Sequence, residues 1–312
     1  MFSNLTLYRF GAPAGAEITF DQLLQMAEAE TFEPCAATQS KSGGWVPPRG
    51  QEHGALVEAV DGHWLLKYRI DKKTVPGSVV REEVNKVAAE IERSQGRKPG
   101  KKEMRDLRDD ATIKLLAQAF VRSTAINVWF DPGRGRLIMD ASSAGKCDDV
   151  ITSIVRGLLG KIEIGMLNAN ESPTACMSQW LVSDDPPEAF TVLQECELKG
   201  TGEQPATIRY KQHSVMIEEV RKHIQEGKLP KSLALNYEGR VSFVLDSSFV
   251  LKKVRFEDGV LDGQENREAD DAFDANVALS TGELGPMIDA LLDALGGEAQ
   301  AVGGETGNRD ED

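Results

Sequence analysis

The sequence predicts an α+β protein with mixed antiparallel sheets, helices and one projecting helical hairpin. Short segments of alternating apolar and polar residues recur along the 312-residue chain, separated by turn sequences such as Asp61-Gly62, which is typical of antiparallel strands. Amphipathic stretches with helical periodicity are interspersed with them. Residues 76–120 contain two such stretches in direct succession, and two helices joined by a short turn form a hairpin.

The segment before the hairpin is predicted to contain one helix at residues 19–27 and three strands at residues 4–10, 55–60 and 63–70. Thr19 or Asp21 is the expected N-cap of the helix, since either side chain accepts a hydrogen bond from a backbone N–H of the first turn. Asp61-Gly62 joins the last two strands as a tight turn. Residues 43–48, Gly-Gly-Trp-Val-Pro-Pro, are interpreted as a rigid turn carrying an aromatic side chain.

The hairpin itself occupies residues 76–120. Its first helix carries an apolar stripe at spacings of four, three and four, formed by Val80, Val84, Val87 and Ile91. Residues 96–100, Gly-Arg-Lys-Pro-Gly, cannot continue a helix, because proline lacks an N–H and glycine favours a turn. A second helix is expected over about 102–120, so that a basic turn lies at the tip of a projecting arm.

Strands and helices continue to the end of the folded region. The expected strands are residues 125–130, 136–140, 189–198, 207–210, 231–237, 241–245 and 249–256. The expected helices are residues 147–159, 214–225, 269–279 and 285–295. Ser214 is the predicted N-cap of the second of these helices. Residues 303–312 are rich in glycine and charge, which predicts disorder.

These elements divide the chain into four parts. Residues 1–75 and 121–200 form a central α+β domain, and their similar strand–helix–strand order raises the hypothesis of an internal duplication. Residues 76–120 form the helical hairpin arm. A C-terminal α+β domain spans 201–300, and a disordered acidic tail follows at 301–312.

Charge is distributed unevenly along the chain, whose net charge is −14. Residues 256–312 hold 16 acidic and 2 basic residues, so the rest of the chain is neutral overall. Two basic blocks stand out within that rest, +6 over residues 63–122 and +5 over 208–255. A single charge run usually marks a solvated helix face. Two blocks in one chain favour a surface for a polyanion, because phosphate binding depends on clustered Lys and Arg.

Sequence motifs give no sign of catalysis, a cofactor or a metal. The four cysteines form no CxxC pair, and no Walker loop, HExxH or GxSxG motif is present. Asp270, Asp271 and Asp274 lack the spacing of a calcium loop. No apolar run is long enough to span a bilayer, and the first residues do not resemble a signal peptide. We therefore expect a cytoplasmic protein that is not an enzyme, with no catalytic residues, no metal, no cofactor and no membrane partner.

Several short motifs, in this order and spacing, make the chain resemble the bacterial recombination-associated RdgC family over about residues 4–300. The motifs are Asn4-Leu5-Thr6-Leu7-Tyr8-Arg9-Phe10, Phe32-Glu33-Pro34-Cys35, Gly44-Trp45-Val46-Pro47-Pro48, Ala119-Phe120, Glu197-Leu198-Lys199, Lys211-Gln212, Leu233-Ala234-Leu235, Phe273-Asp274-Ala275, Thr281-Gly282-Glu283-Leu284 and Gly296-Gly297-Glu298-Ala299-Gln300. The residues after Gln300 extend beyond the family pattern.

The resemblance implies a nucleoid-associated DNA-binding protein without enzymatic activity. Family members resemble ring-shaped homodimers of horseshoe-like α+β subunits that surround duplex DNA with little sequence preference and limit RecA-promoted strand exchange. Family DNA contacts and gate positions correspond to Phe120, Lys211 and Gln212. Gln118 stands where the family pattern has a basic residue, and Arg122 is the candidate that compensates for it.

The residues themselves suggest a DNA-binding surface of the same kind. The basic turn of the arm offers Arg97, Lys98, Lys101 and Lys102 as phosphate contacts. No recognition-helix motif is present, which indicates backbone rather than base readout.

Other interpretations remain open at this stage. Without the resemblance, Phe120 is better interpreted as a core residue that closes the apolar stripe of the arm. Lys211 and Gln212 fit a solvated strand end as well as they fit a DNA contact. Two other functions compete with DNA binding. The first is a protein–protein regulator that docks its acidic C-terminal part on a recombinase, with DNA binding incidental. The second is a nuclease whose site leaves no local motif.

Overall fold

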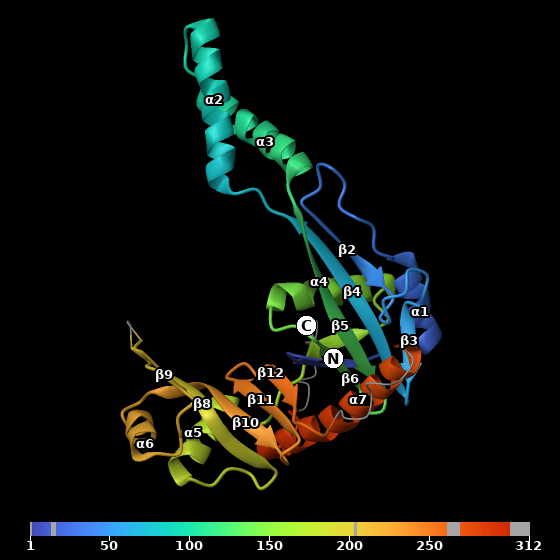
Figure 1. The fold of residues 1–312 in the computed structure, drawn as a ribbon, viewed down its shortest axis with the longest axis vertical. Helices are drawn as coiled ribbons and strands as arrows, with labels where there is room; N and C mark the ends of the chain where they lie inside the picture. The colour runs from blue at the N-terminus through green and yellow to red at the C-terminus, as the bar shows by residue number, and fades with distance from the viewer. Residues whose placement is uncertain (1, 14–16, 203–204, 261–268, 300–312) are drawn as a thin grey trace, which may run out of the picture.

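The computed structural model confirms the α+β class. It describes all residues except 1, 14–16, 203–204, 261–268 and 300–312, so the tail predicted at 301–312 lies outside the described residues. The described part of the chain contains seven helices and two antiparallel sheets. Figure 1 shows an open crescent with a helical arm at one end of its long axis and the second sheet at the other.

The first sheet has seven strands, and its strand order joins segments far apart in the sequence. The strands are β1 (Thr6–Gly11), β2 (Lys41–Val46), β3 (Val57–Val60), β4 (His63–Lys73), β5 (Val121–Asp131), β6 (Arg136–Met139) and β7 (Glu163–Met166). Their order is β2-β4-β5-β6-β1-β7, and β3 pairs with the beginning of β4. β4 and β5 pair over ten positions, from Trp64–Phe130 to Lys73–Val121. The arm therefore continues directly from the two longest strands of the sheet (Figure 1).

The second sheet has five strands in the order β12-β11-β10-β8-β9. The strands are β8 (Phe190–Lys199), β9 (Thr207–Lys211), β10 (Leu229–Tyr237), β11 (Val241–Asp246) and β12 (Leu251–Phe256). The N-terminal segment covers the β12 edge, since Leu5 and Leu251 exchange two backbone hydrogen bonds of 2.7 and 3.0 Å. β8 lies within residues 121–200 of the predicted central domain, but it pairs with β9 and β10 of the predicted C-terminal domain. The division into four parts stays a prediction.

Helices cover the sheets, and the first sheet separates two large hydrophobic cores. The helices are α1 (Phe20–Ala29), α2 (Gly77–Gln95), α3 (Lys101–Gln118), α4 (Ala144–Gly157), α5 (Pro173–Ser183), α6 (Glu218–Gln225) and α7 (Ala269–Ala294). α1 and α4 pack on one face of the first sheet, against Val128 and Phe130. The other face, with Leu65 and Trp129, shares a core with the second sheet and with Leu291 of α7. The long helix α7 thus joins the two sheets (Figure 1).

The arm has a small core of its own. Val80 and Val84 of α2 pack against Ala111 of α3, and Leu107 is partly buried beside them. Lys114 Nζ also donates to Glu83 Oε1 at 2.6 Å across the two helices. The helical hairpin predicted from the sequence is therefore confirmed, and it projects away from both sheets (Figure 1).

Two details of the predicted N-terminal segment have different outcomes. Thr19 is the N-cap of α1, where it forms a reciprocal capping box with Gln22. The rigid turn predicted at 43–48 is wrong, because Gly43–Val46 belong to strand β2. Trp45 is fully buried and its Nε1 donates to Ser153 Oγ at 3.0 Å. Gly44 lies so close to the backbone of Phe32 that an added Cβ would be 2.4 Å from its Cα. The glycine is required by strand packing rather than by a turn.

Two predicted helix boundaries in the C-terminal part are also wrong. α6 begins at Glu218, and Ser214 is not its N-cap, because Ile217 is extended, with φ −135° and ψ 157°, and Val215 is buried in the core at 1% exposure. Residues 269–279 and 285–295 belong mainly to one continuous helix, α7, which contains Pro286. The apolar side chains around this proline, including Leu284 and Met287, are fully buried. Their burial outweighs the loss of a single backbone hydrogen bond at proline. Strand β7 and helix α5 were not predicted.

Candidate nucleic-acid interface

The tip of the arm displays the four basic residues predicted as phosphate contacts. Gly96 ends α2 in the left-handed conformation, with φ 67°, and the chain turns into α3. Arg97 pairs with Glu103 at 2.7 Å, which lowers the pKa of that carboxyl, and Lys98 is 3.9 Å from Glu92. Lys101 and Lys102 are exposed, and within the described residues neither has a carboxylate at ion-pair distance. The tip thus combines two partnered cations with two that are available.

Phe120 stands exposed at the base of the arm. α3 ends at Gln118, and Ala119 is extended with φ −73° and ψ 141°, so Phe120 is no longer in register with the helical stripe. Its exposed fraction is 96%, the highest among the large hydrophobic residues described as exposed. The interpretation of Phe120 as a core residue is therefore wrong. Arg122 follows it near the start of β5, also exposed.

Lys211 and Gln212 lie at the other end of the crescent. Lys211 is the last residue of β9, an edge strand of the second sheet, and pairs in register with Glu195 of β8. Gln212 follows in the left-handed region, with φ 53°, and both side chains are exposed. Figure 1 shows the arm and β9 at opposite ends of the molecule, on the same side of its long axis. One subunit therefore does not bring Phe120 and Lys211 together.

The sequence identified only one member, Arg122, of a further basic region at the base of the arm. Lys41 of β2, Lys72 of β4 and Arg122 of β5 are neighbours across three adjacent strands. With Lys146 of α4 they line a pocket of about 470 Å³. The alternation of β4 contained a signal for it, because Lys72 continues the face of Ile70 beyond the buried core. The partners come from segments up to about a hundred residues apart, and only strand register brings them together.

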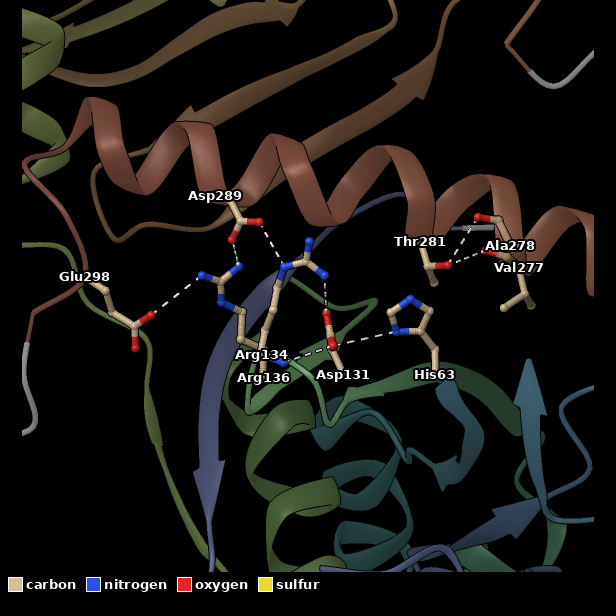
Figure 2. Close-up of polar contacts among 9 residues, drawn as sticks. All are labelled: His63, Asp131, Arg134, Arg136, Val277, Ala278, Thr281, Asp289 and Glu298. Carbon is tan, nitrogen blue, oxygen red and sulfur yellow. Dashed lines mark hydrogen bonds and ion pairs between the residues drawn. The ribbon is translucent and has the colours of Figure 1, made fainter. Parts of the chain in front are cut away.

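An ionic network fastens α7 to the first sheet. In Figure 2, Asp289 of α7 accepts hydrogen bonds from Arg134 Nε at 2.9 Å and from Arg136 Nη1 at 2.5 Å. Arg134 also donates to Asp131 at 3.1 Å, and Arg136 lies 3.6 Å from Glu298. Each carboxylate in the network faces a guanidinium group, which is the arrangement of a structural clamp between two elements.

His63 lies at the edge of this network, 3.8 Å from Asp131 (Figure 2). Burial lowers the pKa of His63 below its usual range, against the attraction of Asp131. No group of three or more His, Cys, Asp or Glu side chains within the described ranges is arranged to hold a metal ion. Nor is any helix there long and apolar enough to cross a bilayer.

The fold and the exposed residues define a class of protein, a two-sheet α+β protein that displays a basic helical arm and a basic sheet edge. The family model described as "Putative exonuclease, RdgC" matches residues 1–298. The recombination-associated protein RdgC of Herminiimonas arsenicoxydans is 40% identical over 299 residues, which cover 95% of this chain and 98% of that protein. Its counterpart from Janthinobacterium sp. (strain Marseille) is 38% identical over 301 residues, covering 96% and 99%. The chain belongs to the RdgC family of recombination-associated proteins.

Proposed function

We propose that this protein binds double-stranded DNA without sequence preference, encircles it as a homodimeric ring, and limits RecA-dependent recombination in the nucleoid. Its relatives are named recombination-associated proteins, which supports a role in that process. The proposal treats DNA as the direct partner, RecA as the activity that is antagonised, and the cytoplasm as the compartment.

The observation that carries the proposal is a set of exposed cations without carboxylate partners. Within the described residues, Lys101, Lys102, Arg122 and Lys211 are exposed and have no carboxylate at ion-pair distance. Most other arginines of the body already pair, as Arg136 does with Asp289. Unpaired surface cations can neutralise phosphates without first breaking a salt bridge, which favours backbone binding.

The shape of the subunit supports the ring. Both ends of the crescent carry candidate residues, Phe120 between α3 and β5 and Lys211 with Gln212 at the end of β9; Figure 1 shows where these elements lie. A twofold axis relates identical surfaces of two copies, so two crescents placed end to end enclose a central space. In this arrangement an exposed aromatic side chain such as Phe120 acquires a partner, either the second subunit or the nucleic acid.

The first test is a salt titration. Fluorescence anisotropy of two unrelated random-sequence duplexes should give affinities within a few-fold of each other, and log affinity should fall with log salt by roughly 0.9 for each phosphate neutralised. A strong preference for one duplex, or no salt dependence, would contradict the proposal. No duplex binding, together with binding of a recombinase through the acidic C-terminal part, would favour the protein–protein regulator.

The ring and the absence of catalysis need separate measurements. Light scattering during size-exclusion chromatography, with and without duplex, should show a dimer that retains DNA. A monomer at micromolar concentration would exclude the ring. Because the family description contains the word exonuclease, a labelled duplex incubated with the protein and magnesium should stay intact. Loss of label that depends on protein and magnesium would replace the proposal with a nuclease.

A further inference from the structure

The basic pocket at the base of the arm contains an arrangement of charge that the fold alone does not explain. Lys41 lies directly opposite Lys72 in the β2–β4 ladder, and Lys72 lies directly opposite Arg122 in the β4–β5 ladder. Side chains directly opposite in antiparallel strands have Cβ atoms about 4.5–5.5 Å apart, and like charges at that spacing destabilise a sheet. An anion bound beside these three cations would offset their mutual repulsion.

Strand alternation aims this row at α4. On β4, Leu66, Tyr68 and Ile70 face the core beneath α1 and α4, and Lys72 continues the same face. On β5, Ile126 faces the same core, and Arg122, four residues before it, lies on the same face of the strand. The face that holds the helices thus changes from apolar to cationic where the sheet extends past the core. Lys146, near the start of α4, adds a fourth cation from the opposite wall.

Among the residues that line the pocket, one carboxylate, Asp149, offsets the charge of the four cations. Asp149 accepts hydrogen bonds from Lys41 Nζ at 2.5 and 2.6 Å. Within the part of the chain that the structure describes, Lys72, Arg122 and Lys146 have no carboxylate at ion-pair distance. The pocket walls therefore carry a net charge of +3 in a space of about 470 Å³. That volume lies in the range of pockets that hold small-molecule ligands.

We propose that this pocket binds a phosphoryl group. Its three unpaired cations match the charge and the several acceptor oxygens of a phosphate. The positive end of α4 opens on the same space through Gly145, which leaves room for an anion beside the first turn. When the protein is bound to DNA the group is a backbone phosphate, a statement that rests on the proposed function. Otherwise it belongs to a free phosphate ester such as a mononucleotide.

The test compares the full-length protein with the double variant Lys72→Gln/Lys146→Gln. The matched control is Lys161→Gln/Lys222→Gln, which removes the same charge at two exposed positions outside the pocket. Melting temperature is measured at constant ionic strength with increasing inorganic phosphate, and then with a 5′-mononucleotide. Wild type and control should be stabilised as phosphate rises, since a ligand of the folded state raises its stability. The double variant should lose most of that response.

A second readout separates binding from a structural role. In phosphate-free buffer the double variant should melt at the same temperature as wild type or higher, because it relieves repulsion between Lys72 and its neighbours. A lower melting temperature there, or an undiminished response to phosphate, overturns the proposal.

Duplex affinity then identifies the source of the phosphoryl group. A loss of roughly two- to fivefold per side chain, relative to the control, assigns a DNA phosphate to the pocket. Unchanged duplex affinity with a lost mononucleotide response assigns a free phosphate ester. If wild type binds no duplex, the proposed function fails, while the phosphate titration still decides the pocket.

Discussion

The clamp between α7 and the first sheet gives a prediction whose size follows from burial. Replacing Asp289 with Ala leaves Arg134 paired with Asp131, but it leaves Arg136 with only the longer contact to Glu298, at 3.6 Å. The Arg136 side chain is only 9% exposed, whereas Asp289 is 40% exposed. Breaking a fully buried pair costs roughly 3–5 kcal/mol, and partial exposure of one partner reduces this. We expect Asp289→Ala to lower the free energy of unfolding by about 2 kcal/mol.

The assay is urea denaturation followed by circular dichroism, with thermal melting as a second measure. For a chain of 312 residues, about 2 kcal/mol corresponds to a decrease in melting temperature of roughly 3 °C. Asp293→Ala is the matched control, since Asp293 is exposed on the same helix and has no ion pair among the described residues. A double-mutant cycle with Arg136→Met should show a coupling energy of at least about 0.5 kcal/mol. Equal stability of the Asp289 and Asp293 variants would refute the clamp.

Three further predictions follow from single contacts. Phe120→Ala should change the free energy of unfolding by less than about 0.5 kcal/mol in urea denaturation, because the ring is 96% exposed, and a large loss would restore the interpretation as a core residue. Gly44→Ala should destabilise by more than about 3 kcal/mol or prevent folding, because its Cβ would meet backbone atoms of Phe32; wild-type melting would show that β2 can shift. The third concerns Glu30, whose pKa is lowered by hydrogen bonds from Arg156. Its folded pKa lies below the unfolded value, so its stabilisation is present above about pH 4.5 and is lost as pH falls through the folded pKa. Glu30→Gln should therefore be less stable than wild type near neutrality. The difference between the urea midpoints of the two proteins should narrow below about pH 4.5, and a difference that does not change with pH would contradict the assigned role of Glu30.

Local signals in the sequence were sufficient for elements whose stability is largely local. The arm was predicted because a stripe such as Val80–Val84 needs only the partner helix that follows it in the chain. The turn at Asp61-Gly62 was predicted because this dipeptide tolerates positive φ at both positions, and the structure has φ of 52° and 81° there. The capping box of Thr19 and Gln22 likewise involves residues three positions apart. The basic composition of the arm and of the β9 region is also visible without a structure.

Only the tertiary structure decided features that depend on residues distant in the chain. Pro286 lies inside α7 because burial between two sheets outweighs a local helix-breaking signal. Phe120 is exposed because α3 ends two residues before it, where β5 begins to pair with β4. The row Lys41–Lys72–Arg122 exists only through the registers of two ladders. A side-chain pattern shows which face of a strand a residue occupies, but the register that sets its neighbours is determined by packing across the whole sheet.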